Sequence, residues 1–301
     1  MKIKKILSIL FMVLVLAVIS ACGSDEGASG DDSNNSDGEQ TLLDQIKEEN
    51  TVTIGFANEA PYAYEDENGE LKGAAVEIAT KVFHNMGIEN VEGNIAKWDN
   101  LIPGVKAGNF DVVTAAMAIL PERAEQVDFG EPEIQYGEGL IVKKGNPLDL
   151  HSYADIANNP DVTVAVMSGA TEVDFLKEMG VSEDQIITVD DIPATFSAVQ
   201  SGRADATTGT EMTVKMALQS SDQDALEFVE DFEQPDIKGV PSYGAAAFSP
   251  DSDALREAYN AELKKLKESG EILDLITPSG FGEGNLVPND LTTEQVIEDL
   301  N

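Results

Sequence analysis

The arginine at position 123 is the first residue whose type and placement suggest a chemical role. The chain has three arginines, and Arg123 lies in MAILPERAEQVDFG, shortly after the apolar stretch 111–116. A guanidinium group binds a carboxylate well, because it can donate two parallel charged hydrogen bonds. The same residue could instead form a surface ion pair with Glu122 or Glu125, an interaction that contributes little to stability. Local pattern leaves both interpretations open.

A glutamate with aromatic neighbours is the natural counterpart of that arginine. Glu59 lies close to Tyr62 in FANEAPYAY, residues 56–64. A carboxylate beside aromatic rings is suited to a small cation, through direct pairing and through cation–π contact. The alternative is an ordinary surface loop.

Two further segments could line the same site. Trp98 is the only tryptophan and begins a helical stretch, where it could be part of the core or face a cleft. Gly169 and Thr171 lie in a turn between an apolar strand and a helix. Backbone N–H groups at the start of a helix readily bind an anion.

The sequence offers little material for catalysis or metal binding. Cys22 is the only cysteine, and His84 and His151 are the only histidines. A His/Cys metal site is therefore improbable, and neither histidine has a catalytic partner nearby in the sequence. No phosphate-binding glycine loop is present. We expect a protein that binds a ligand, with no metal or cofactor.

Alternating strands and helices are expected to position these residues. This alternation predicts an α/β fold with mostly parallel sheets, whose ligands bind beyond the carboxyl ends of the strands. The expected strands are 52–57, 94–96, 111–116, 138–142, 162–167, 186–189, 206–208 and 243–248. The expected helices are 74–86, 100–107, 172–179, 194–201, 211–219 and 253–268.

One helix–turn–strand unit occurs twice, 94 residues apart. The two copies are LIPGVKAGNFDVVT, which begins at Leu101, and TFSAVQSGRADATT, which begins at Thr195. In each copy a helical stretch ends at a glycine, Gly108 or Gly202, and an aspartate follows three residues later. Glycine is common just after a helix because it adopts the left-handed conformation at low cost. The duplication indicates two similar lobes.

The two lobes are expected to be connected by two crossing segments. The first lobe would comprise residues 41–142 and 245–301, and the second residues 143–244. One crossing is expected at 143–147, and the second through the strand 243–248. Two lobes joined by two crossings form a hinge, with a ligand cleft between them.

The N-terminus resembles a bacterial lipoprotein signal. Residues 1–21 have a lysine-rich start, an apolar stretch and small residues before Cys22, which is the pattern of a cleaved secretory signal. The thiol of Cys22 would be lipidated. Residues 22–40 contain no large apolar side chain, so we expect a disordered acidic tether.

The charge of the chain excludes some partners. Its 19 basic and 56 acidic residues give a net charge of −37, and loss of the three lysines in the signal would lower this to −40. Nucleic acid and anionic lipid headgroups are therefore excluded as partners of the folded part. Such a surface favours solubility, and it would also suit a salty exterior, where salt screens self-repulsion.

The residues from Leu42 to Phe281 resemble the solute-binding proteins of ABC importers, in the family that takes up polar amino acids. The motifs are IGFANEAPYAYEDENGELKG, LIPGVKAGNFDVV, PERAEQVDFGEP and GRADATTGT. The resemblance implies a type II periplasmic-binding-protein fold and a monomer that delivers its ligand to a permease and its ATPase. It implies these roles: Arg123 binds the ligand carboxylate, Ala118 faces the ligand, Gly169 to Thr171 supply donors from the second lobe, and Glu59 and Trp98 line the cleft.

Thr210 departs from the pattern of the amino-acid-binding members. They have an aspartate at this position that holds the ligand's α-ammonium group, and a buried ammonium without a partner is costly. FANEAPYAY, VKKGNPLDLHSY and YGAAAFSP instead resemble the ectoine- and hydroxyectoine-binding branch. In that case Glu59 would take the amidinium N–H groups, Arg123 the carboxylate and Tyr62 the ring face.

Ala118 is a misfit with that branch, which usually has an aromatic residue there; Trp98 or Tyr136 could supply the missing wall. One alternative ligand is a polar amino acid such as glutamine, with Glu59 or Glu172 holding its ammonium. Another alternative is a dehydratase-type enzyme on the same fold, for which Glu59 is the only evident acid–base group. A sensor ectodomain is disfavoured, because no second apolar segment follows. An exported protein, lipid-anchored on the outer face of a Gram-positive cell membrane, is expected.

Overall fold

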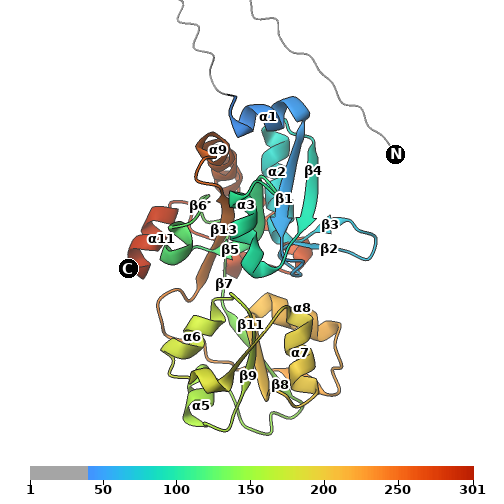
Figure 1. The fold of residues 1–301 in the computed structure, drawn as a ribbon, viewed down its shortest axis with the longest axis vertical. Coiled ribbons are helices and arrows are strands. Elements are labelled where there is room, and N and C mark those ends of the chain that lie inside the picture. The colour runs from blue at the N-terminus through green and yellow to red at the C-terminus, as the bar shows by residue number, and fades with distance from the viewer. Residues whose placement is uncertain (1–39) are drawn as a thin grey trace, which may run out of the picture. The chain divides into compact units, whose positions relative to one another are not determined.

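Two β-sheets organise residues 40–301, the part of the chain that the structure, a computed structural model, describes (Figure 1). The first sheet has the order β4-β1-β5-β13-β6, with β7 beside β13, and the second has the order β10-β9-β11-β8-β12. Each sheet with the helices packed on it is called a lobe below. The expected signal, Cys22 and nearly all of the expected tether lie outside the described residues. Among the helices of residues 40–301, none has both the length and the apolar character that a membrane span requires.

The first lobe is built from both ends of the described chain. Its strands are β1 (Thr51–Phe56), β4 (Asn90–Ile95), β5 (Val112–Ala118), β6 (Asp128–Phe129), β7 (Ile134–Tyr136) and β13 (Ser242–Phe248), with the hairpin β2 (Tyr64–Glu65) and β3 (Leu71–Lys72) beside them. Its helices are α1 (Leu42–Glu49), α2 (Ala74–Asn85), α3 (Leu101–Lys106), α4 (Pro121–Ala124), α9 (Asp253–Ser269), α10 (Glu271–Ile276) and α11 (Thr293–Leu300).

The second lobe is formed by the middle of the chain. Its strands are β8 (Glu138–Lys143), β9 (Val164–Met167), β10 (Ile186–Val189), β11 (Ala206–Thr210) and β12 (Leu226–Phe228). Its helices are α5 (Tyr153–Asn158), α6 (Glu172–Glu178), α7 (Ile192–Gln200) and α8 (Glu211–Gln219).

Helices cover both faces of each sheet, because successive strand residues point to opposite sides. In the first lobe α2, α9 and α10 pack on the face that carries Val112, and α3 and α11 pack on the face that carries Val113. In the second lobe Leu140 faces α5 and α6, whereas Ile141 faces α7 and α8. The α/β prediction is therefore confirmed. The expectation of mostly parallel sheets is wrong, because β8 and β13 pair antiparallel with all their neighbours.

The duplicated unit has the same structural role in both lobes. Gly108 and Gly202 have φ angles of 70° and 76°, as the helix ends require. The aspartate that follows accepts a hydrogen bond from a neighbouring backbone, Asp111 from Thr53 N at 2.7 Å and Asp205 from the N–H of residue 163 at 2.9 Å. Each carboxylate thus fixes the entry of an adjacent strand.

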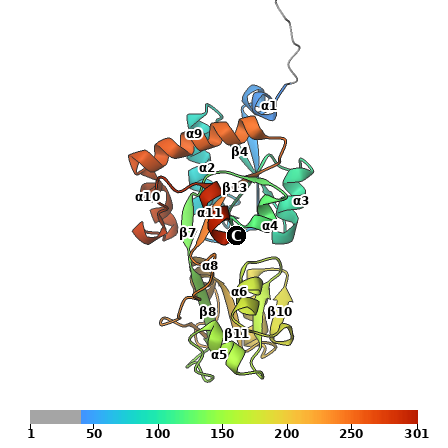
Figure 2. The same ribbon diagram turned by 90° about the vertical axis from the view of Figure 1, so that its left-hand side faces the viewer.

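The first crossing lies earlier than the sequence suggested. β8 pairs with β11 and β12, so this strand belongs to the second sheet and the chain crosses near Gly137, between β7 and β8. Figure 2 shows β7 and β8 following one another from one lobe into the other. The expected crossing at 143–147 is wrong, since an apolar strand pattern does not show which sheet the strand joins. Strand pairing favours lobe boundaries near residues 137 and 241, in place of 142 and 244.

Candidate ligand-binding cleft

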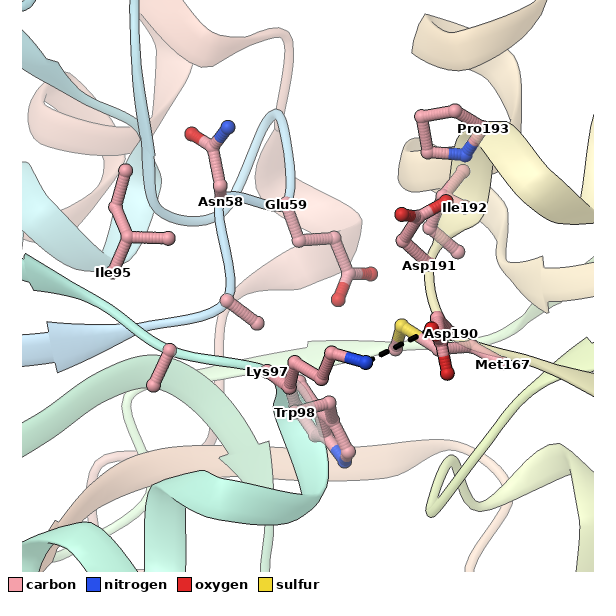
Figure 3. A pocket seen from close by; sticks show the side chains of 12 residues that line it. Asn58, Glu59, Ile95, Lys97, Trp98, Met167, Asp190, Asp191, Ile192 and Pro193 are labelled. Carbon is pink, nitrogen blue, oxygen red and sulfur yellow. Dashed lines mark hydrogen bonds and ion pairs between the residues drawn. The ribbon is translucent and has the colours of Figure 1, made fainter.

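A cavity of about 450 Å³ lies between the two lobes (Figure 3). The loop after β1, the end of β4 and the following turn line it from the first lobe, and the ends of β9 and β10 line it from the second. The expected residues Glu59 and Trp98 are on its wall, and Figure 3 shows the Glu59 carboxyl group directed toward the second lobe. This position at the carboxyl ends of parallel strands is where α/β sheets bind ligands.

Glu59 is half-buried and is hydrogen-bonded across the cleft. Thr213 Oγ1 donates to Glu59 Oε1 at 2.6 Å, and Thr210 Oγ1 donates to Thr213 Oγ1 at 2.8 Å. Burial raises the pKa of Glu59 to about 7, the hydrogen bond from Thr213 opposes this change, and the charge of Glu172 adds to it. Thr210, which replaces the aspartate of the amino-acid-binding pattern, therefore supports Glu59 through Thr213.

Arg123 is buried between the two lobes and donates to two backbone carbonyls. Its Nη1 lies 3.2 Å from Ala118 O, and its Nη2 lies 3.0 Å from Gly169 O. Burial lowers the pKa of the Arg123 guanidinium group from its ordinary value. The hydrogen bonds go to carbonyls rather than to Glu122 or Glu125, so the surface ion pair is not the arrangement that the structure holds.

The turn at Gly169 contacts the first lobe as an acceptor. Gly169 O receives hydrogen bonds from both Arg123 and Trp98 Nε1, the latter at 3.1 Å. The Arg123 guanidinium carbon also lies 5.8 Å from the centre of the Trp98 ring. Thr171 is buried, and its hydroxyl donates to Glu172 Oε2 at 3.5 Å. The expectation of donors at Gly169 and Thr171 thus stays a prediction for a ligand-bound form.

Tyr62 and Ala118 lie away from the open cavity. The Tyr62 ring makes T-shaped contacts with Tyr136 and Phe281, at centroid distances of 5.3 Å and 5.0 Å. Its hydroxyl is buried and has no hydrogen-bond partner among the described residues. Ala118 lines a separate cavity of about 220 Å³, together with residues of α11 and of the second crossing. Tyr136 Oη donates to Ala116 O at 2.8 Å.

Two buried glutamates near Glu59 were not recognised as a pair from the sequence. Glu138, the first residue of β8, is 0% exposed, and Glu172, the first residue of α6, is 3% exposed. Burial raises the pKa of Glu138 well above its ordinary value, and the charge of Glu172, a hydrogen bond shared with Glu172 and the charge of Glu59 add to this rise. Glu172 was considered only as an alternative ammonium partner. The signal for Glu138 was an acid immediately before the apolar run GLIV.

An ion pair at the mouth of the cleft was also missed. Lys97 Nζ lies 2.8 Å from Asp190 Oδ2, and the pair joins the end of β4 to the end of β10 (Figure 3). Nearby, Ser168 Oγ donates to Asp99 Oδ2 at 3.4 Å. Together with the contacts at Gly169, these bonds hold the two lobes against each other.

The chain is similar to proteins of one well-populated family. The sequence pattern of the bacterial extracellular solute-binding proteins, family 3, matches residues 52–278. The probable amino-acid ABC transporter periplasmic-binding protein y4tE of Sinorhizobium fredii is 37% identical over 243 residues, which are 79% of this chain and 80% of the relative.

Solved structures give a consistent picture. EhuB in complex with hydroxyectoine has a TM-score of 0.76 and 33% identity, over 85% of this chain and 97% of EhuB. The ancestral amino acid-binding protein AncCDT-1, described as a precursor of cyclohexadienyl dehydratase, has a TM-score of 0.67 and 29% identity, over 79% of this chain and 99% of that protein.

Proposed function

This chain belongs to family 3 of the bacterial extracellular solute-binding proteins, and from that premise we propose that it captures a small zwitterion by lobe closure and delivers it to the permease and ATPase of an ABC importer. The observation that carries the proposal is the pair of opposite charges presented by the first lobe. Arg123 and Glu59 are both hydrogen-bonded by the second lobe, at Gly169 O and Thr213 Oγ1.

The carboxylate of the ligand is assigned to Arg123. In the structure the guanidinium group is satisfied by two neutral carbonyls. A carboxylate would give shorter, charge-assisted hydrogen bonds and would neutralise the buried cation. Such a ligand must bind the closed form better than the open form, because only differential affinity shifts a conformational equilibrium.

The cationic end of the ligand is assigned to Glu59, and ectoine or hydroxyectoine is the preferred ligand. Thr210 presents a hydroxyl where the amino-acid pattern has a carboxylate, and that hydroxyl supports Glu59 through Thr213. A cyclic amidinium, which has no free α-ammonium group, matches this arrangement. The similarity to a hydroxyectoine complex supports the choice.

A polar amino acid such as glutamine is the second candidate ligand. Glu138 and Glu172 are buried carboxyls near Glu59: the charge of Glu172 raises the pKa of Glu59, and the charge of Glu59 raises the pKa of Glu138. They could hold an α-ammonium group without the missing aspartate. The relative y4tE is itself described as a probable amino-acid transporter protein.

A binding protein is favoured over an enzyme. The pKa of Glu59, about 7, would suit a general acid or base, and AncCDT-1 shows that this fold has been linked to a dehydratase. Arg123 and Glu59, however, are assigned to the two ends of the proposed ligand as charged binding partners, and not as groups that transfer a proton. Product analysis after incubation with the bound solute would detect turnover, and conversion of the solute would overturn the assignment.

The remaining parts of the proposal concern location. We place the protein outside the cytoplasm as a monomer, anchored by lipid on Cys22 at the outer face of a Gram-positive membrane. Replacement Cys22→Ala should move the protein from the membrane fraction to the medium.

The acidic chain is also proposed to be salt-adapted. Its melting temperature should rise from low to molar NaCl, and a flat or falling curve would refute this.

Isothermal calorimetry tests the ligand directly. The protein is titrated separately with ectoine and with glutamine while Trp98 fluorescence is followed. Because Trp98 bridges the lobes at Gly169, closure around a ligand should change its signal. Tight binding of ectoine alone supports the amidinium site. Binding of glutamine alone supports the second candidate.

A further inference from the structure

We infer that Glu138 is a binding residue, and that Glu59, Glu138 and Glu172 together form an acid pocket for the cationic end of the ligand that selects cations bearing N–H groups over quaternary ammonium groups. The inference rests on the proposed function, because it concerns the ligand captured in the cleft. It assigns to the site two carboxyls that the pairing of Arg123 with Glu59 does not need.

The fold brings the three carboxyls together from three segments. Glu138 pairs with Thr210 in the register of β8 and β11, and it shares a sheet face with Leu140, which packs toward α5 and α6. Glu172 is the first residue of α6, on that same side. Glu59 reaches the second lobe from the loop after β1.

Glu138 is buried with no cation or N–H donor beside it. Neither of its carboxyl oxygens receives a hydrogen bond from a donor group of residues 40–301, although the side chain is 0% exposed, and its polar neighbour is a second carboxyl group, that of Glu172. No lysine, arginine or histidine of the described residues forms a salt bridge with any of the three glutamates. An unpaired buried carboxyl is costly, and a fold retains one where a ligand supplies the missing donors.

A second unpartnered group belongs to the same place. The hydroxyl of Tyr62 is buried and also lacks a hydrogen-bond partner among the described residues. Burial raises the pKa of Tyr62, and the charges of Tyr136, Glu59 and Glu138 add to that rise, whereas the nearby side chain of Thr210 opposes it. A pocket with several carboxyl oxygens is suited to a ligand that has several hydrogen-bond donors.

The chemistry of the occupant follows from the donor count. Once ionised, carboxylates accept hydrogen bonds and donate none, so an ammonium or amidinium group that displaces their protons can satisfy several of these oxygens at once. A quaternary ammonium group has the same charge but no N–H, and would leave Glu138 unsatisfied.

Cation binding should release protons from the pocket. The pKa values of Glu59 and Glu138 are both raised, so part of the carboxyl charge is neutralised by protons before the ligand binds. The other titratable groups that face the pocket are Arg123 on α4 and the phenols of Tyr62, Tyr136 and Tyr153. Burial raises the pKa values of the three phenols, which stay protonated near neutrality, and the arginine stays charged.

Calorimetry on the full-length protein and on Glu138→Gln tests the inference. The probes are ectoine, glutamine, and the matched cyclic pair L-proline and N,N-dimethyl-L-proline, each titrated at pH 7 in two buffers of different ionisation enthalpy. We expect the wild type to prefer N–H probes over the quaternary probe by about tenfold or more, and Glu138→Gln to lose about tenfold in affinity. Proton release should fall in the variant.

Glu133→Gln is the matched control. Glu133 is equally buried and its pKa is also about 7, but it lies in the first lobe and is bonded to Tyr259. Its replacement should leave affinity and proton release unchanged. A thermal melt separates folding from binding: Glu138→Gln should melt no lower than the wild type, and Glu172→Gln provides a second test of affinity.

The outcomes distinguish the two proposals. If ectoine or glutamine binds but the quaternary probe binds equally well, or Glu138→Gln keeps full affinity and proton release, the acid pocket is wrong and the proposed function stands. If no probe binds the wild type, the proposed function fails, and the inference fails with it.

Discussion

Two buried glutamates five residues apart have opposite surroundings. Glu133 receives a hydrogen bond from Tyr259 Oη at 2.6 Å, and Lys267 lies close enough to offset part of its charge. Glu138 receives no hydrogen bond from a donor group of the described residues, and the neighbouring Glu172 is a second carboxyl group that raises its pKa. Burial raises both pKa values. The difference teaches that burial alone does not identify a binding residue, whereas missing partners beside an interlobe cleft do.

The largest expected effect concerns the cation that faces the acid pocket. Arg123→Ala should weaken binding of a carboxylate ligand at least about 30-fold, because loss of a buried charged partner costs about 2–5 kcal/mol. Calorimetry with the ligand identified for the wild type measures this. Arg256→Ala, which removes an arginine paired with Asp253 on α9, should bind normally. Near-native affinity of Arg123→Ala would show that the carboxylate is held elsewhere.

The pH dependence of stability should reveal Glu133 as a structural group. Its folded-state pKa of about 7 exceeds the ordinary value of 4.5. The native state therefore keeps a proton that the unfolded state loses, and stability from this group is fully present below pH 4.5 and is lost as pH rises to about 7. The loss is about 3 kcal/mol.

Urea denaturation of the wild type and of Glu133→Gln between pH 4 and pH 8 isolates this contribution. The difference in unfolding free energy between the two proteins should decline across that window. A difference independent of pH would mean that Glu133 is ionised in the folded protein, and the contrast with Glu138 would then rest on hydrogen bonds alone.

The pH dependence of ligand affinity should reveal Glu59 as a binding group. Its pKa of about 7 means that it gains a proton below neutrality and can no longer pair with a cation. Affinity should fall by up to about tenfold per pH unit below pH 7 and change less steeply above it, where only the proton of Glu138 remains to be released. Glu59→Gln should bind weakly with a flatter profile. An unchanged affinity from pH 8 to pH 5 would remove Glu59 from the site.

The regular elements of both lobes could be predicted from the sequence, but the contacts made by the residues at their ends could not. Apolar periodicity and the duplicated glycine and aspartate located β1, β5, β9, β11 and the main helices, because these features are local. β12 is only three residues long, and β4 begins four residues before the predicted strand at 94. α11 was not predicted, although its capping box at Thr292 and Gln295 is a local signal.

The candidate site could likewise be predicted only in part from the sequence. Glu59, Trp98 and Arg123 were predicted by residue type and by resemblance, and the structure brings all three to the interface between the lobes. Glu138 was not predicted, because its role depends on which sheet β8 joins. That choice is a long-range pairing with β11, and a strand's own residues do not encode it.

The smallest expected effect concerns the exposed ion pair at the cleft mouth. The side chains of Lys97 and Asp190 are 58% and 74% exposed, so the pair should contribute no more than about 0.2–1 kcal/mol to closure. Lys97→Ala should therefore weaken ligand binding less than about fivefold, and salt should remove most of the difference. Lys264→Ala, an exposed lysine paired with Glu268 on α9, is the control. A loss comparable to that of Arg123→Ala would mean that Lys97, rather than the buried arginine, faces the ligand carboxylate. In that case an exposed residue would recognise the ligand, and the buried arginine would serve to hold the lobes together.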